Sequence, residues 1–257
     1  MNMRGKTLVI SGGTRGIGKA IVDKFAAEGV NIAFTYNSNE EEAKKICEQV
    51  GAEHGIKIKA YKLDILEPDT YKAVFEELDK DFDRVDYFIS NAIISGRSVV
   101  GGFAPFMRLK QKGLNNIYTA TVLAFVVGAQ EAAKRMEKVG GGAIVALSST
   151  GNLVHTENYA GHGNSKAAIE TMVKYAATEL APKNIRVNAL SGGPIETDAL
   201  RAFPNFEELK AEVIKRTPLG RMGQAEDLAP IALFLCQQGS YWINGQTIIA
   251  DGGSSFT

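Results

Sequence analysis

The sequence has few of the residues that build disulfide-rich, metal-binding or membrane-spanning proteins. Its 257 residues include two cysteines and three histidines, which form no metal-ligand spacing. No apolar run reaches the ~18 residues of a membrane helix, and Met1–Lys6 is not an apolar signal segment. We therefore expect free thiols, a reducing cytoplasmic location, no metal and no membrane partner.

The chain also lacks an excess of either charge. Lysine plus arginine and aspartate plus glutamate number 29 each, so no electrostatic attraction to nucleic acid or to an anionic membrane is expected. There is no proline-rich linker, charge block or internal repeat. These absences favour a single domain over residues 1–257.

A glycine-rich loop follows the first apolar run, Thr7–Ile10, and precedes a helical pattern over Lys19–Glu28. A strand, a glycine loop and a helix in this order can bind a pyrophosphate, because bare backbone and free helical N–H groups face the ligand. The glycines are more widely spaced than in the G-x-G-x-x-G fingerprint, and a plain tight turn is the alternative. The candidate binding residues of the loop are Gly12, Thr14, Arg15, Gly16, Ile17 and Gly18.

The end of the second strand indicates which nicotinamide cofactor is used. NAD-binding folds usually place an acid there to hold the ribose 2′-hydroxyl, but Asn31–Tyr36 is followed by the neutral Asn37 and Ser38. Arg15 could instead bind a 2′-phosphate. The pattern therefore favours NADPH over NADH.

Strand and helix patterns alternate along the chain, which predicts an α/β fold with a doubly wound parallel sheet. Asp64 and Asn91 end the third and fourth strands, where such folds bind ligands, although both could equally be turn residues. The expected strands include Thr7–Ile10, Asn31–Tyr36, Lys57–Leu63, Asp86–Ser90, Ala143–Leu147 and Thr247–Ala250, and the expected helices include Lys19–Glu28, Glu40–Val50, Thr70–Asp81, Leu114–Lys138, Phe206–Lys215 and Ala225–Cys236.

Two segments near the predicted ligand edge have further roles to suggest. Ile93–Lys112 is glycine-bearing and irregular, and we expect it to shape one wall of a substrate pocket. The helix over Leu114–Lys138 carries more apolar residues than one sheet-facing stripe needs, so some could pack against a second subunit. Ser149 follows the fifth strand as a candidate pocket hydroxyl, and Trp242 is expected in packing or at an interface.

The segment Asn158–Lys166 carries the strongest catalytic signal. Lys166 lies four residues beyond His162 and seven beyond Tyr159, so the three point from one helix face. Such a lysine can hold a cofactor hydroxyl and lower the pKa of the phenol. The alternative is a surface tyrosine and lysine that merely share a face.

The chain resembles the short-chain dehydrogenase/reductase family over essentially its full length. The resemblance implies a Rossmann-type fold of about seven parallel strands, a nicotinamide cofactor and a homotetramer. The matching motifs are Gly12-xxx-Gly16-x-Gly18, Asn91-Ala92, Ser149, Lys166, Val187-Asn188 and Asp251-Gly252-Gly253.

Departures from the usual family pattern point to one branch of it. Most members carry a catalytic tyrosine four residues before the lysine, where this chain has His162, and an asparagine near the position of Thr121. The Tyr159-x6-Lys166 spacing and the run Gly193-Pro194-Ile195-Glu196-Thr197 resemble the enoyl-[acyl-carrier-protein] reductases. The best match is the NADPH-using type often called FabL, which extends through Phe203-Pro204-Asn205.

The resemblance implies reduction of trans-2-enoyl thioesters, carried by acyl carrier protein or coenzyme A, in fatty acid elongation. Tyr159, Lys166 and Ser149 would be catalytic, and His162 is interpreted as a packing residue, with proton donation as its alternative. A segment at about 197–216 would cover the substrate. The alternatives are a carbonyl or 3-oxoacyl thioester reductase and a non-catalytic NADPH-binding protein. The residues implied to bind the cofactor outside the glycine loop are Asp64, Asn91, Ala92, Lys166, Pro194, Ile195 and Thr197.

Overall fold

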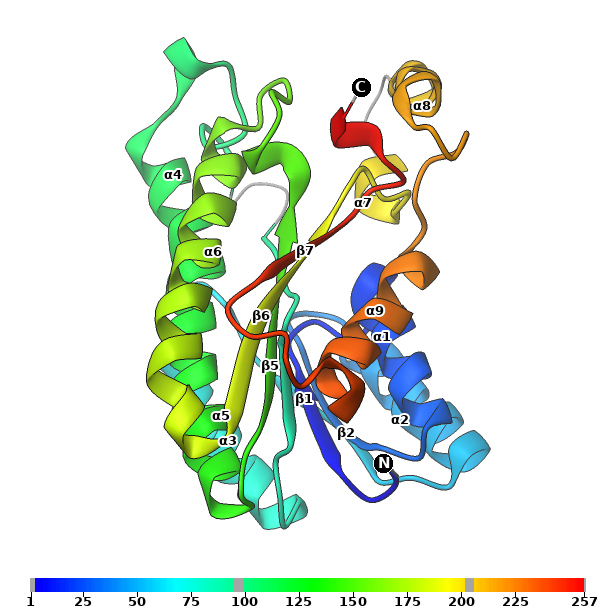
Figure 1. The fold of residues 1–257 in the computed structure, drawn as a ribbon, viewed down its shortest axis with the longest axis vertical. Coiled ribbons are helices and arrows are strands. Elements are labelled where there is room, and N and C mark those ends of the chain that lie inside the picture. Colours follow the sequence, from blue (N-terminus) through cyan, green and yellow to red (C-terminus); the bar gives the residue numbers. More distant parts are fainter. Residues whose placement is uncertain (1–2, 95–98, 202–205, 257) are drawn as a thin grey trace.

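A seven-stranded parallel sheet runs through the molecule, with helices on both of its faces (Figure 1). The computed structural model describes residues 3–94, 99–201 and 206–256. The strand order is β3-β2-β1-β4-β5-β6-β7, with every pairing parallel. This confirms the predicted doubly wound fold, because each strand returns through a helix on one face of the sheet.

The elements lie close to the positions that the sequence pattern predicts. The strands are β1 (Thr7–Ile10), β2 (Asn31–Tyr36), β3 (Ile58–Lys62), β4 (Tyr87–Ser90), β5 (Gly142–Ser149), β6 (Ile185–Gly192) and β7 (Thr247–Ala250). The α-helices are α1 (Gly16–Ala27), α2 (Glu40–His54), α3 (Thr70–Asp81), α4 (Gln111–Tyr118), α5 (Ala124–Lys138), α6 (Ala160–Leu180), α7 (Asp198–Arg201), α8 (Phe206–Arg216) and α9 (Ala225–Cys236).

Two hydrophobic cores form, one on each face of the sheet. Helices α3, α5 and α6 cover one face and α1, α2 and α9 the other (Figure 1). Strand β6 is buried along its whole length, since helices cover both of its faces. A third, smaller cluster holds α7 and α8 together and consists of the buried Phe206, Val213 and Met222 with Leu200 and Leu209 against them.

The strand order reverses between β1 and β4, and this reversal sets the place of the ligand site. The chain passes outward from β1 to β3, then returns to pair β4 with the other side of β1. A crevice at the carboxyl ends of the strands is the usual ligand site at such a switch point. Ser11 and Gly12 follow β1 there, and Asn91 follows β4.

One expectation differs from the structure. The helix expected over Leu114–Lys138 is interrupted by a π-helical turn at Thr119–Leu123, which contains the buried Thr121. Of the two roles expected for Trp242, the structure excludes packing within this chain, because the side chain is 94% exposed, and the interface role stays a prediction. Phe203-Pro204-Asn205, part of the resemblance, lies outside the described residues. None of the helices in the described part of the chain combines the length and apolarity needed to cross a membrane.

Candidate active site

Tyr159 lies directly before the first residue of α6 and belongs to a cluster of three aromatic rings. Its ring stacks on His162, with centroids 5.3 Å apart and planes at 23°. Phe103 meets both edge to face, with its centroid 6.2 Å from that of Tyr159 and 6.1 Å from that of His162. Aromatic pairs contribute about 0.5–1.5 kcal/mol each beyond burial. The cluster therefore fixes the direction of the phenol.

Ser149 is the polar side chain that acts on the phenol. Its hydroxyl lowers the pKa of Tyr159 and accepts a hydrogen bond from the backbone N–H of Gly151 at 3.2 Å. A Cβ at Gly151 would lie 2.5 Å from the Tyr159 ring, so the phenol packs directly over a bare backbone. The end of strand β5 and the turn after it thus pack against the phenol and help to position it.

The prediction that Lys166 lowers the pKa of the Tyr159 phenol is wrong. Burial raises the pKa of Tyr159 above its usual value, and the Ser149 hydroxyl opposes that rise. Lys166 is two helical turns away and takes no part in this balance. Its ammonium instead donates to the Leu147 carbonyl at 2.6 Å. Without a bound ligand, the phenol is therefore un-ionised at neutral pH.

Lys166 is itself deeply buried, with 6% of its surface exposed. Burial lowers the pKa of its ammonium to about 8, while the charge of Glu170 acts in the opposite direction. The side chain is therefore mostly protonated at neutral pH and close to its titration point.

His162 occupies the position where most members of the resembled family carry the catalytic tyrosine. It is 9% exposed, and burial together with the charge of Lys166 lowers its pKa to about 4. At neutral pH the imidazole is uncharged and stacked against Tyr159. These observations favour the packing interpretation of this residue.

The buried neutral state of His162 has a consequence for acid stability. Because the unfolded chain binds a proton near pH 6.5 and the folded chain only near pH 4, stability is lost as pH falls through this window. Between pH 7 and pH 5, the free energy of unfolding should therefore fall by up to about 2 kcal/mol less in His162→Phe than in the wild type. Urea unfolding at both pH values measures this effect. The exposed His155, replaced in the same way, is the control, and an equal effect at both positions would refute the assignment.

The glycine loop is braced across the switch point by Asn91. Its side-chain amide donates to the carbonyls of Ser11 at 3.0 Å and of Gly12 at 2.8 Å. The Ser11 hydroxyl accepts from the backbone N–H groups of Asn91 and Ala92 at 3.0 and 3.1 Å. Asn91 is therefore placed to shape the loop, while its predicted contact with the cofactor stays a prediction.

The backbone of the loop fits a dinucleotide. Gly12 and Gly16 have φ values of +75° and +53°, which side-chain-bearing residues rarely adopt. A Cβ at Gly18 would lie 1.8 Å from the Gly12 carbonyl oxygen. Helix α1 begins at Gly16 and directs its free N–H groups at this bare surface. A pyrophosphate could approach here without meeting a side chain.

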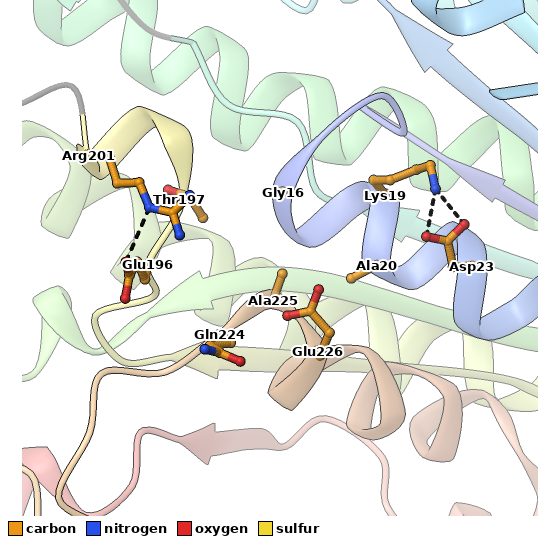
Figure 2. Close-up of a pocket in the computed structure, with 10 residues that line it drawn as sticks. All are labelled: Gly16, Lys19, Ala20, Asp23, Glu196, Thr197, Arg201, Gln224, Ala225 and Glu226. Atoms are coloured by element: carbon orange, nitrogen blue, oxygen red, sulfur yellow. Dashed lines mark hydrogen bonds and ion pairs between the residues drawn. The ribbon is translucent and has the colours of Figure 1, made fainter. Parts of the chain in front are cut away.

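A cavity of about 500 Å³ opens beside this loop, between α1, the segment after β6 and the start of α9 (Figure 2). Of the predicted cofactor residues, Gly16 and Thr197 line it, facing each other from opposite sides. A Cβ at Gly16 would come within 4 Å of Thr197 alone, at 3.7 Å, so these two walls of the cavity lie close together at this point. Its walls also carry two ion pairs, Lys19 with Asp23 and Arg201 with Glu196. Tyr159 is not part of this cavity.

The remaining predicted cofactor residues occupy the same edge of the sheet. The Asp64 carboxylate accepts from the Leu66 N–H at 2.9 Å, which is the turn role considered as its alternative. Ile195 is buried and bridges to Gly223, while the Pro194 carbonyl accepts from the N–H of that glycine. Arg15 is exposed at the start of α1. No group of three or more metal-binding side chains converges within residues 3–94, 99–201 and 206–256.

Sequence reasoning missed how closely the segment before α4, and α4 itself, approach α6. A Cβ at Gly161 would lie 2.4 Å from the Gly102 carbonyl oxygen, and one at Gly113 would lie 2.3 Å from the Gly102 nitrogen. We call Gly102, Gly113 and Gly161 the glycine junction. This junction places Phe103 against Tyr159. The glycines of Ile93–Lys112 were the signal in the sequence that could have revealed this close approach.

Comparison with known proteins assigns the family. A family model described as "Enoyl-(Acyl carrier protein) reductase" matches residues 12–255. The chain belongs to the short-chain dehydrogenase/reductase family. Family membership makes it an oxidoreductase with a nicotinamide cofactor.

Curated relatives in this family include reductases of two kinds of thioester. The chain is 36% identical to 1-cyclohexenylcarbonyl-CoA reductase of Streptomyces collinus, over 98% of this chain and 88% of the relative. It is 30% identical to the 3-oxoacyl-[acyl-carrier-protein] reductase FabG of Aquifex aeolicus, over 98% of each chain. Sequence similarity thus supports the family without choosing between C=C and C=O reduction.

Solved short-chain dehydrogenase/reductase structures have the same fold. The enzyme of Serratia marcescens superposes with a TM-score of 0.89 at 28% identity, covering 99% of this chain and all of that one. A short-chain alcohol dehydrogenase-like protein of Sinorhizobium meliloti gives 0.91 at 25% identity, covering 100% and 98%. The predicted family and fold are therefore confirmed.

Proposed function

We propose that this short-chain dehydrogenase/reductase reduces the C=C bond of trans-2-enoyl thioesters with NADPH. The observation that carries the proposal is the place of Tyr159, held at the head of α6 by ring contacts with Phe103 and His162. The position one turn later holds a neutral histidine. The phenol available for catalysis is therefore displaced by ~4.5 Å along the helix from the ketone-reductase position.

This displacement suits the chemistry of an enoyl thioester. In ketone reduction the hydride and the proton go to two directly bonded atoms. In enoyl thioester reduction the hydride goes to the β-carbon, and negative charge develops on the thioester oxygen, three bonds away. An acid placed one turn closer to the N-terminus of the helix can stabilise that charge. The name of the Streptomyces relative, which describes reduction of an unsaturated acyl-CoA, supports this substrate class.

The residues of this chain divide the work. The glycine loop and Thr197 would hold the cofactor, and Lys166 would hold its nicotinamide ribose. A bound NADPH would supply the hydride to the β-carbon, and a proton relayed through the Tyr159 hydroxyl would complete the reduction at the α-carbon. The Tyr159 hydroxyl donates a hydrogen bond to the thioester oxygen, which stabilises the charge that develops there. Ser149 orients that hydroxyl, and the packed rings of Phe103 and His162 exclude water from one side.

A second function is favoured by one specific pair of residues. A serine hydroxyl that acts on the phenol of Tyr159 is the pairing that a carbonyl reductase would use on a 3-oxoacyl thioester, and the FabG relative carries that activity in its name. An NADPH-binding protein without catalysis is the third reading. A half-buried phenol on the same helix face as a buried lysine argues against it, because a sensor has no use for an acid there.

One experiment separates the three. NADPH oxidation is measured with crotonyl thioester and with the matching 3-oxobutyryl thioester, each on acyl carrier protein and on coenzyme A. Turnover of the crotonyl substrates alone is the expected result. Turnover of the 3-oxo substrates alone would replace the proposal with the second function. NADPH binding without turnover of either substrate would leave the third function.

A cytoplasmic homotetramer is the form in which we propose the enzyme acts.

The cofactor preference gives a separate prediction. Arg15→Ala should weaken NADPH binding by about 10–100-fold, the value of a charge-assisted hydrogen bond to phosphate, and leave NADH binding unchanged. Fluorescence titration with both cofactors measures the effect. Lys24→Ala, on the same helix, is the control. Equal losses for both cofactors would show that Arg15 does not read the 2′-phosphate.

A further inference from the structure

Helix α6 and strand β5 face each other through two consecutive polar contacts. Lys166 Nζ donates to the Leu147 carbonyl at 2.6 Å, and the Ser148 hydroxyl donates to Glu170 Oε1 at 2.5 Å. The strand residues are adjacent in sequence, and the helix residues are one turn apart, so the contacts lie side by side. The carboxylate of Glu170 is therefore fixed one helical turn beyond Lys166, close enough for its charge to act on the buried ammonium without a direct ion pair.

A buried ammonium needs such a neighbour. Removing a charge from water is costly, and the cost is offset where an opposite charge lies close by. Among the described residues, Glu170 is the acid whose charge acts on Lys166. His162, one turn before Lys166, is the other titratable group beside it, and it is neutral. From β5 only a carbonyl and a hydroxyl reach this pair.

We propose that Glu170, held in place by Ser148, is a positioning residue that keeps Lys166 protonated and directed at the cofactor site. It touches neither cofactor nor substrate and acts through Lys166. The fixed geometry matters because a freely rotating glutamate would be hydrated and its charge screened. The hydroxyl of Ser148, which is 9% exposed, holds one carboxylate oxygen on the strand side of the helix. The inference rests on the proposed role of Lys166 as a cofactor ligand and does not depend on which thioester is reduced.

The test is the pH dependence of NADPH binding, measured by fluorescence between pH 7 and pH 10 without substrate. In the wild type, affinity should fall as Lys166 loses its proton near pH 8. Lys166→Met should abolish this alkaline loss and thereby assign it. In Glu170→Gln, which keeps a side chain of the same shape, the midpoint should move to lower pH by about one unit. Ser148→Ala should shift it by less in the same direction.

Matched variants distinguish a charge effect from general damage. Glu170→Asp retains the carboxylate and should restore the midpoint toward that of the wild type. Glu179→Gln makes the same exchange at an exposed site on the same helix and should leave the profile unchanged. The proposal is overturned if Glu170→Gln titrates like the wild type, if Glu179→Gln shifts equally, or if the alkaline loss persists in Lys166→Met. Because no thioester is present, these outcomes are independent of the proposed reaction.

Discussion

Tyr159→Phe should lower kcat for a crotonyl thioester by about 10²–10³-fold while leaving NADPH affinity within about twofold. The change removes one hydroxyl and keeps the ring that packs against Phe103 and His162. The loss therefore reports on the charge that develops at the thioester oxygen in the transition state. Steady-state kinetics measures the loss of turnover, and fluorescence titration measures NADPH affinity separately, so the two effects are distinguished.

Tyr175→Phe is the matched control for this experiment, because Tyr175 lies on the same helix with 65% of its surface exposed. It should behave as the wild type. His162→Phe keeps an aromatic ring under the phenol and should cost far less than Tyr159→Phe. If His162→Phe abolished turnover and Tyr159→Phe did not, the imidazole would be the acid and the shifted phenol a packing residue.

Gly18→Ala should abolish measurable NADPH binding. The added methyl group would lie 1.8 Å from the Gly12 carbonyl oxygen and 2.6 Å from the amide of Asn91. Neither can yield without opening the loop, since that same amide holds the loop by two hydrogen bonds. Overpacking of this kind also destabilises a fold, here by about 1–3 kcal/mol. Fluorescence titration and urea unfolding measure the two effects.

The control glycine for this substitution is Gly239, which lies far along the chain. A Cβ there meets only Phe234 at an ordinary 3.5 Å, and its backbone is not left-handed. Gly239→Ala should bind NADPH as the wild type does. Retention of tight binding by Gly18→Ala would mean that the loop holds no pyrophosphate and that the cavity beside Thr197 serves another ligand.

The sequence predicted the sheet well because its signals are local. Each apolar run is bounded by a turn and followed by a helical period, and the strands found at Asn31–Tyr36 and Thr247–Ala250 have the predicted bounds. The π-helical turn at Thr119–Leu123 was not predictable in this way. Its residues continue the helical pattern on both sides, and the extra residue becomes visible only in the backbone hydrogen bonds.

The sequence placed the candidate catalytic residues on one helix, but it did not give the electrostatics around them. Tyr159 and Lys166 were found from their spacing, yet the lysine acts on His162 and leaves the phenol unaffected. Helical spacing gives the face from which a side chain starts. It does not give the partner that a long side chain reaches, which for Lys166 is a carbonyl on another strand. Phe103 was likewise beyond sequence reasoning, because its ring contacts depend on chain packing nearly sixty residues away.

The glycine junction limits how the enzyme could be redesigned. Where Gly102, Gly113 and Gly161 meet, no side chain can be inserted. The segment before α4 and helix α6 therefore keep one spacing, whatever the substrate. The opposite side of the predicted pocket is built differently, since α7 and α8 rest on a small core of their own around Phe206 and Val213. Variant libraries for bulkier acyl groups should therefore target the surface of α8 and spare the glycines. Laboratory evolution would be expected to accept mutations in the same uneven distribution.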